Sequence, residues 1–74
     1  MRVDICDRDD DAAFAQLKRI LHDMGAVPIE GSALAMTFRM GTDTLFVFRG
    51  PSSIELEGPD ELVKQIVGKM TFFA

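Results

Sequence analysis

Alternation of apolar and polar residues predicts strands in several parts of the chain. The predicted strands cover about 2–6, 33–40, 44–49 and 53–57. The stretch 44–49 is apolar at most of its positions, which is typical of a central strand. Turns that contain glycine, at 41–43 and 50–52, join the last three strands, and 29–32 is predicted to be a loop.

Apolar residues spaced three and four positions apart predict two amphipathic helices. The first covers roughly 10–24, with Asp9 or Asp10 as its amino-terminal cap and the glycine that follows it as its carboxy-terminal cap. The second begins with Pro59 at its first position and ends near Met70. Acidic residues in the first turn of each helix suit the positive end of the helix dipole.

The predicted element order is β-α-β-β-β-α, within one α+β domain that covers residues 1–74. Helices and a sheet of this kind bury their apolar sides against each other. We therefore expect a two-layer sandwich, with two helices on one face of a mainly antiparallel sheet of three or four strands. These patterns do not determine where strand 2–6 docks, nor whether Phe72 and Phe73 pack on the core or form an exposed anchor.

Two signals conflict over the pairing of the consecutive strands. Glycine at the first position of the turn favours a two-residue loop, which pairs Phe38 with Leu45. A three-residue loop pairs Phe38 with Phe46 and brings the largest side chains to one face, and we give this burial precedence. The core face is then predicted to hold Met36, Phe38, Phe46, Phe48, Ile54 and Leu56. The open face is predicted to hold Thr37, Arg39, Leu45, Val47, Glu55 and Glu57.

The composition favours a small protein of a reducing compartment. The chain has 12 acidic and 8 basic residues, a net charge of −4, and one cysteine, Cys6. A single cysteine forms no intramolecular disulfide, and small secreted domains usually depend on such bonds. The first residues are charged where a signal peptide is apolar, and no apolar run reaches the roughly 18–20 residues that span a bilayer. We therefore expect a cytoplasmic protein without a membrane contact.

The acidic balance decides which partners are expected. Nucleic acid is disfavoured, because its binding depends largely on Lys and Arg side chains that neutralise phosphates. A basic protein is attracted by the same acidic charge. Acids at the predicted helix starts and on the last strand are the candidate partner-binding residues: Asp7, Asp9, Asp10, Asp11, Glu55, Glu57, Asp60 and Glu61. The predicted open face adds an apolar patch with a charged rim, formed by Arg39, Leu45 and Val47.

No metal site is expected from the acidic run. Asp7, Asp9 and Asp11 resemble the start of an EF-hand calcium loop. Such a loop requires a glycine at its sixth position and a glutamate at its twelfth, where this chain has Ala12 and Lys18. The acids are better explained as a helix cap and solvated charge.

No catalytic residue or cofactor site is expected either. Cys6 and His22 are the available nucleophile and base, and no motif places a third group beside them. Cys6 is better explained as a small strand residue, and His22 as an exposed residue near the end of a helix. The glycines are isolated turn residues rather than a phosphate-binding loop.

The leading hypothesis is a small acidic, non-catalytic protein-binding module. Its sharpest version is an inhibitor that blocks the basic nucleic-acid-binding groove of a larger complex, as anti-CRISPR and DNA-mimic proteins do. One alternative is a homodimeric or subunit-type structural module that pairs through its open sheet face. In that case the acidic charge serves solubility.

A second alternative is a weak nucleic-acid binder. From residue 10 onward the order α-β-β-β-α resembles the double-stranded-RNA-binding domain in topology, which implies binding by shape and phosphate contacts. The basic residues available for such contacts are Lys18, Arg19, Lys64 and Lys69. That family carries lysines at the start of its second helix, where this chain has Pro59, Asp60 and Glu61.

Overall fold

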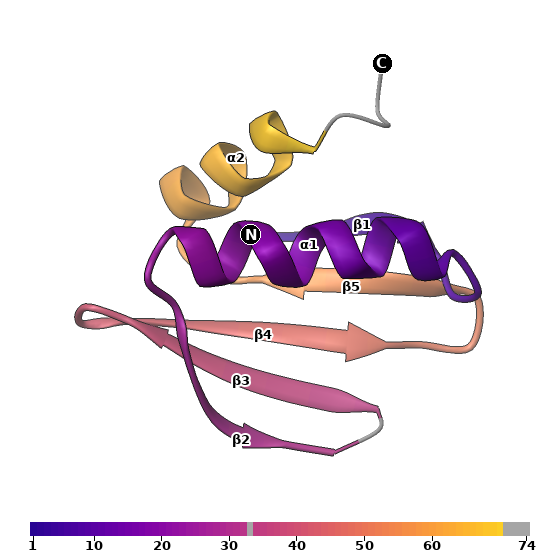
Figure 1. Cartoon of the computed structure of the whole chain (residues 1–74), viewed down its shortest axis with the longest axis horizontal. Coiled ribbons are helices and arrows are strands. Elements are labelled where there is room, and N and C mark those ends of the chain that lie inside the picture. The colour runs from indigo at the N-terminus through magenta and orange to yellow at the C-terminus, as the bar shows by residue number, and fades with distance from the viewer. Residues whose placement is uncertain (33, 71–74) are drawn as a thin grey trace.

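In the computed structural model, the chain folds into an antiparallel sheet with two helices on one face (Figure 1). The structure describes residues 1–32 and 34–70. The elements in chain order are β1 (Arg2–Asp7), α1 (Asp11–Asp23), β2 (Val27–Gly31), β3 (Ala35–Met40), β4 (Asp43–Arg49), β5 (Ser53–Glu57) and α2 (Asp60–Lys69). The sheet order is β1-β5-β4-β3-β2. The predicted α+β two-layer class is confirmed, and among the described residues the sheet has one strand more than the largest number expected.

The additional strand is β2, which occupies part of the segment 29–32 that was predicted to be a loop. All of its side chains are exposed, so it has no apolar alternation that could reveal a strand. Pro28 is tolerated because β2 lies at an edge of the sheet, where a missing amide donor breaks no central ladder. The strand also separates α1 from β3, so the predicted α-β-β-β-α order is wrong.

The first strand closes the sheet at its other edge. β1 pairs antiparallel with β5, with Val3 opposite Leu56 and an irregularity between Asp4 and Cys6. This pairing brings the amino-terminal strand against the last strand in sequence. Both edge strands are therefore irregular, since β2 also shifts its register, between Pro28 and Glu30.

The caps of α1 agree with the sequence. The Asp10 side chain accepts a hydrogen bond of 3.0 Å from the amide of Ala13, which makes Asp10 the amino-terminal cap. Gly25 follows the helix with a φ of 87°, a left-handed conformation that glycine adopts without a steric cost. In α2, Pro59 precedes the first helical residue, one position earlier than predicted. The predicted tail with Phe72 and Phe73 lies outside the described residues.

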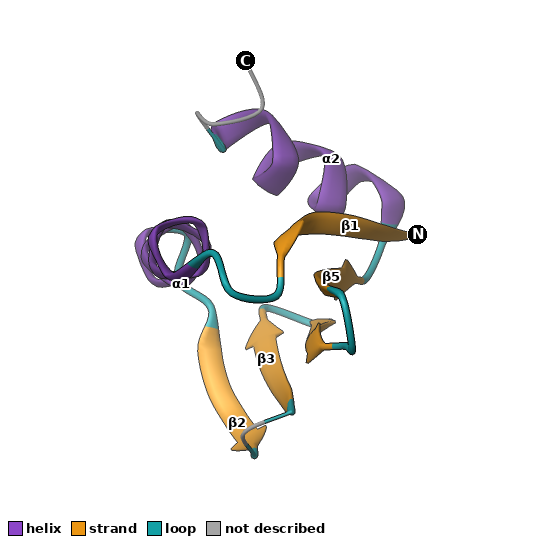
Figure 2. Cartoon of the chain, turned by 90° about the vertical axis from the view of Figure 1, so that its right-hand side faces the viewer, coloured by secondary structure: helices purple, strands orange, loops and turns teal. Residues whose placement is uncertain are grey.

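Both helices lie on the same side of the twisted sheet, as the view along α1 shows (Figure 2). They bury aliphatic side chains against the sheet residues that face them. The core cluster includes Leu17 and Leu21 from α1, Val63 and Ile66 from α2, and Ile5, Leu45, Val47, Ile54 and Leu56 from the strands. Burial of these aliphatic surfaces is the main stabilising contribution to the fold.

The predicted strand register is wrong by one residue. Phe38 pairs with Leu45, and Gly41 has a φ of 62°, so the first turn is the two-residue loop that glycine at its first position favours. Leu45 is 0% exposed and Val47 is 2% exposed, so these two residues belong to the core face. Because successive strand residues alternate between the two faces, Phe46 and Phe48 lie on the open face.

The second turn agrees with this register. Arg49 pairs with Ile54 and Val47 pairs with Leu56, so Phe48 lies opposite Glu55 and not beside a core residue. The aliphatic side chains of β4 and β5 therefore meet on the face that the helices cover. Ile54 and Leu56 were correctly predicted as core residues, and each is 0% exposed.

Candidate interaction site on the open sheet face

Two phenylalanines of β4 form the centre of the face that the helices leave open. The rings of Phe46 and Phe48 are stacked, with 6.1 Å between their centroids and 17° between their planes. Both side chains are apolar, and both are partly exposed. Aromatic side chains at a sheet surface offer a large rigid contact area, so this pair is an apolar feature at the middle strand of the open face.

An arginine and two glutamates lie on one side of the pair. Arg2 Nε donates a hydrogen bond of 2.8 Å to Glu55 Oε1, and Arg2 Nη1 lies 3.5 Å from Glu57 Oε1. The guanidinium carbon of Arg2 also lies 4.7 Å from the centroid of the Phe48 ring. The hydrogen bond to Glu55 is the largest of the effects that raise the pKa of the Arg2 guanidinium above its usual value. Arg2 therefore combines ion pairing with stacking on an aromatic ring.

A hollow of about 410 Å³ lies on the other side of the pair. Its lining consists of Glu30, Gly31, Ser32, Ala35, Thr37, Phe46 and Phe48. The small side chains of Ala35 and Thr37 leave room beside the rings, because they lie directly opposite Phe48 and Phe46 on the neighbouring strand. Glu30, on β2, lies opposite Thr37 of β3 and is the one charged residue among the described residues that line the hollow.

The pairing registers place these groups in one row across the sheet. From edge to edge the row reads Arg2, Glu57, Phe46, Thr37 and Glu30. An aromatic ring thus lies at the middle strand, with an acidic side chain toward each edge. Each step between strands is about 4.8 Å, so Glu30 and Phe46 are roughly 10 Å apart along the row.

The predicted sheet-face residues are partly brought together here. Arg39 is exposed and pairs with Thr44 of β4. Thr44 is next to the buried Leu45 and therefore points to the open face, so Arg39 lies on the open face too. Leu45 and Val47 do not belong to this surface, because the register buries them under the helices. The pattern Phe-x-Phe in β4, read with the two-residue turn, was the signal that could have identified the aromatic pair.

Several of the predicted acidic residues already have partners within the chain. Asp10 caps α1, and Asp11 Oδ1 lies 3.6 Å from Arg49 Nη2. Asp60 Oδ1 lies 3.1 Å from the amino-terminal ammonium group, and Glu55 and Glu57 pair with Arg2 as described above. These pairs are exposed, so each contributes little to stability. Their carboxylates are shared with neighbouring cations rather than fully available to a partner.

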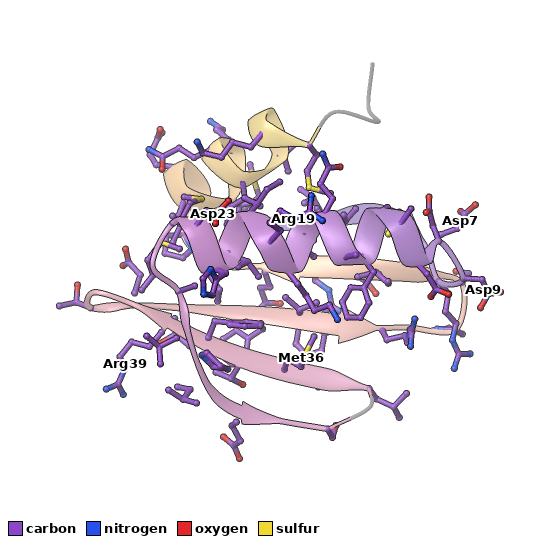
Figure 3. The ribbon with its side chains drawn as sticks, in the orientation of Figure 1. Asp7, Asp9, Arg19, Asp23, Met36 and Arg39 are labelled. Atoms are coloured by element: carbon purple, nitrogen blue, oxygen red, sulfur yellow. The ribbon has the colours of Figure 1, made fainter. Side chains whose placement is uncertain are left out.

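The two acidic groups at helix starts lie far apart. Asp60 lies beside the start of β1, whereas Asp7 and Asp9 lie at its other end, at the start of α1 (Figure 3). A strand of this length spans about 20 Å, which separates the two groups. Glu61 is exposed next to Asp60, so it belongs to the first of these locations.

The negative charge is carried by the sheet and its turns rather than by the helices. Each helix balances its charges, with Asp11 and Asp23 against Lys18 and Arg19 in α1, and with Asp60 and Glu61 against Lys64 and Lys69 in α2. The net charge of −4 therefore comes from the remaining segments. On the open face, Asp4, Glu30, Glu55 and Glu57 outnumber Arg2 and Arg39.

Cys6 and His22 lie on different elements and make no contact that would activate the thiol. His22 is highly exposed on α1, where its Nδ1 lies 3.7 Å from Asp23 Oδ1. Cys6 is half-buried in β1; burial raises the pKa of its thiol, and the charges of Asp10 and Asp7 raise it further. A raised pKa disfavours the reactive thiolate.

A second hollow, of about 310 Å³, lies on the helix side of the sheet. Its lining consists of Lys18, His22, Ala26, Pro28, Met36 and Phe38. Within residues 1–32 and 34–70, no group of three or more His, Cys, Asp and Glu side chains is arranged to hold a metal ion. Neither helix among those residues is long and apolar enough to cross a bilayer.

Comparison of the chain with protein-family models, with curated proteins and with solved structures finds no match.

Proposed function

We propose that this chain is a non-catalytic module that binds a protein through its open sheet face. The observation that carries this proposal is the stacked pair of Phe46 and Phe48, which is partly exposed at the centre of the face opposite the helices. Interfaces commonly have an apolar, aromatic centre within a polar rim. Here the rim is formed by Arg2, Arg39 and Glu30 with the two glutamates of β5.

The size of a typical interface sets how much of the domain a partner would cover. Such an interface buries about 800 Å² on each partner, roughly a sixth of the 4600 Å² surface of this domain. The edges are less suited to binding by strand addition, because both edge strands have irregular pairing and β2 contains Pro28.

The charge of the face favours a protein over a nucleic acid. Stacked aromatic rings on a sheet also bind bases in single-stranded RNA and DNA. Such sites combine the rings with cations that neutralise phosphates, whereas acids outnumber bases on this face. A partner with basic residues is attracted by the same arrangement.

The acidic side chains support a narrower candidate, an inhibitor that fills a basic nucleic-acid-binding groove. Asp7, the last residue of β1, and Asp9, just beyond it, are exposed and have no ion pair among the described residues, so they are available to such a groove. The separation of Asp7 and Asp60 along β1 means that a groove engaging both would have to extend along the whole strand. This candidate and the sheet-face module differ in the residues that a partner contacts.

Site-specific photo-crosslinking in the cells that produce the protein tests the proposal. A benzoylphenylalanine side chain is placed at Thr37, on the open face, and in a matched variant at Lys64, on the outer side of α2. We expect crosslinks to a protein from position 37 and few from position 64. Crosslinks between two copies of the chain at position 37 would favour the homodimer instead.

Two other results would contradict the proposal. Crosslinks to nucleic acid from position 37 would favour the nucleic-acid-binding alternative. Crosslinks from position 64 alone would move the interaction to the helix layer, away from the phenylalanine pair.

A further inference from the structure

The contacts of Arg2 show how this face holds a guanidinium group. The Arg2 side chain stacks over Phe48 at 4.7 Å while its Nε donates a hydrogen bond to Glu55 at 2.8 Å. About half of the side chain remains exposed, so this arrangement forms at the surface without deep burial. An aromatic ring and a carboxylate one strand away are therefore sufficient to position an arginine here.

The hollow on the other side of the rings contains the same two kinds of group. Phe46 and Phe48 line it from β4, and Glu30 is its charged lining residue, on β2. Unlike the Glu55 carboxylate, the Glu30 carboxylate makes no ion pair or hydrogen bond within the described part of the chain, and Glu30 is exposed at the edge of the sheet. The hollow thus has aromatic side chains and an acidic residue in its lining, and none of the described residues that line it is a cation.

The dimensions and charge of the hollow favour one class of occupant. Its volume of about 410 Å³ is larger than one side chain needs, and the residues between Glu30 and the rings are small: Gly31, Ser32, Ala35 and Thr37. The roughly 10 Å between the strand positions of Glu30 and Phe46 suits a long side chain that stacks on a ring and reaches a carboxylate. An anionic group is repelled by Glu30, and a purely aliphatic one gains no attraction from this carboxylate.

We propose that this hollow binds an arginine side chain presented by a basic segment of a protein partner. The arginine extends from the rings of Phe46 and Phe48 across Thr37 to Glu30, a longer span than the single strand step between Phe48 and Glu55 that Arg2 bridges. Arginine fits better than lysine, because its planar guanidinium stacks on rings and donates two parallel hydrogen bonds to a carboxylate. This inference rests on the proposed function and specifies the chemistry of the partner.

Titration with a short peptide tests the inference without knowledge of the partner. The peptide acetyl-Gly-Arg-Gly-amide is added to the ¹⁵N-labelled protein, and amide shifts are followed by NMR. We expect saturable shifts that concentrate at Glu30, Ser32, Thr37, Phe46 and Phe48. The same peptide with citrulline, which keeps the shape and loses the charge, is expected to bind at least several-fold more weakly.

Two charge-matched variants separate a local contact from general attraction. Glu30→Gln is expected to weaken binding of the arginine peptide about three- to fivefold, the effect of one exposed ion pair. Asp23→Asn removes the same charge at the far end of α1, and it is expected to leave the affinity unchanged (Figure 3). Because Glu30 is exposed and its carboxylate has no partner among the described residues, the first variant is expected to fold normally.

The outcomes that overturn the inference are distinct from those that overturn the proposed function. Equal binding of the citrulline peptide, equal effects of both variants, or shifts confined to other surfaces would each refute the arginine site. If such a result accompanied protein crosslinks from position 37, the open face would remain a protein-binding surface with a different specificity. If both experiments failed, neither proposal would stand.

Discussion

The strand register makes a prediction that separates two neighbouring residues of β4. Leu45 is 0% exposed and packs in the core cluster, whereas Phe46 is partly exposed on the opposite face. Although phenylalanine is the larger residue, Leu45→Ala should therefore destabilise the protein more than Phe46→Ala. The comparison tests the placement of the whole strand, because a slip of one residue would exchange the two environments.

The expected magnitudes follow from what each substitution removes. Leu45→Ala deletes buried methyl groups and leaves a cavity, at a cost of about 3–4 kcal/mol. Phe46→Ala removes a partly exposed ring and its stacking on Phe48, at a cost of about 1–2 kcal/mol. A domain of this size has a free energy of unfolding on the order of 4–11 kcal/mol, so the first change removes a large share of it.

Urea denaturation measures the difference. With a slope of about 1 kcal/mol per M, Leu45→Ala should lower the midpoint by about 3–4 M and Phe46→Ala by about 1–2 M. If Leu45→Ala leaves too little folded protein to measure, the milder pair Leu45→Val and Phe46→Leu preserves the comparison. A larger loss for the Phe46 variant in either pair would refute the register and return the phenylalanines to the core.

Three further substitutions test other parts of the fold. The methyl group introduced by Gly58→Ala would meet Leu45 Cδ2, so this variant should lose about 1–3 kcal/mol of unfolding free energy in urea titrations. The loss should be smaller when Leu45→Ala is also present, and strictly additive losses would contradict the contact. Asp10→Ala should lose about 1 kcal/mol of stability with the helix cap, whereas the matched change Asp9→Ala should stay within about 0.5 kcal/mol; equal losses would count against the cap. The pKa of the Cys6 thiol is higher in the folded protein than its ordinary value of 9.0, so folding favours the protonated thiol. The stability that this preference contributes is fully present below pH 9.0 and is lost as the pH rises through the folded-state pKa. Native protein should consequently react with iodoacetamide more slowly than urea-unfolded protein at pH 8, and its unfolding free energy relative to Cys6→Ala should fall at alkaline pH; a faster native reaction would contradict the raised pKa.

The parts of the fold that were predictable carry strong local signals. The first helix follows from its apolar spacing, an aspartate cap and a terminal glycine, all of which lie within one short segment. Strand β2 has no such signal, because its side chains are all exposed and its conformation depends on pairing with β3. A strand of that kind is determined by its neighbour rather than by its own sequence.

The register was not predictable from burial, because β4 is apolar on both faces. When successive residues such as Leu45 and Phe46 are both apolar, the pattern does not indicate which of them faces the core. The correct signal was Gly41, whose left-handed φ closes the two-residue turn. Residue size was the wrong criterion here, because the aliphatic residues pack under the helices and the larger rings stack on each other outside.

The candidate site was predictable only in part for a related reason. Glu55, Glu57 and Arg39 were correctly expected on the open face, since β3 and β5 alternate clearly. Arg2 and Glu30 reach this face through the docking of β1 on β5 and through the existence of β2. Both depend on pairings that no local pattern specifies.

The pairing of β1 with β5 has a consequence for how the chain acquires its structure during synthesis. Strands β2 to β5 are joined by short turns, so each can find its neighbour as soon as it leaves the ribosome. β1 is synthesised before its partner strand and can pair only once Glu57 is available. Closing the loop of about fifty residues between β1 and β5 costs roughly 2 kcal/mol more in chain entropy than closing a short turn. Until then Ile5 stays outside the core cluster formed by the helices and the other strands. The edge strand that carries Arg2 is therefore expected to join the sheet after the hairpins of β2 to β5 have formed.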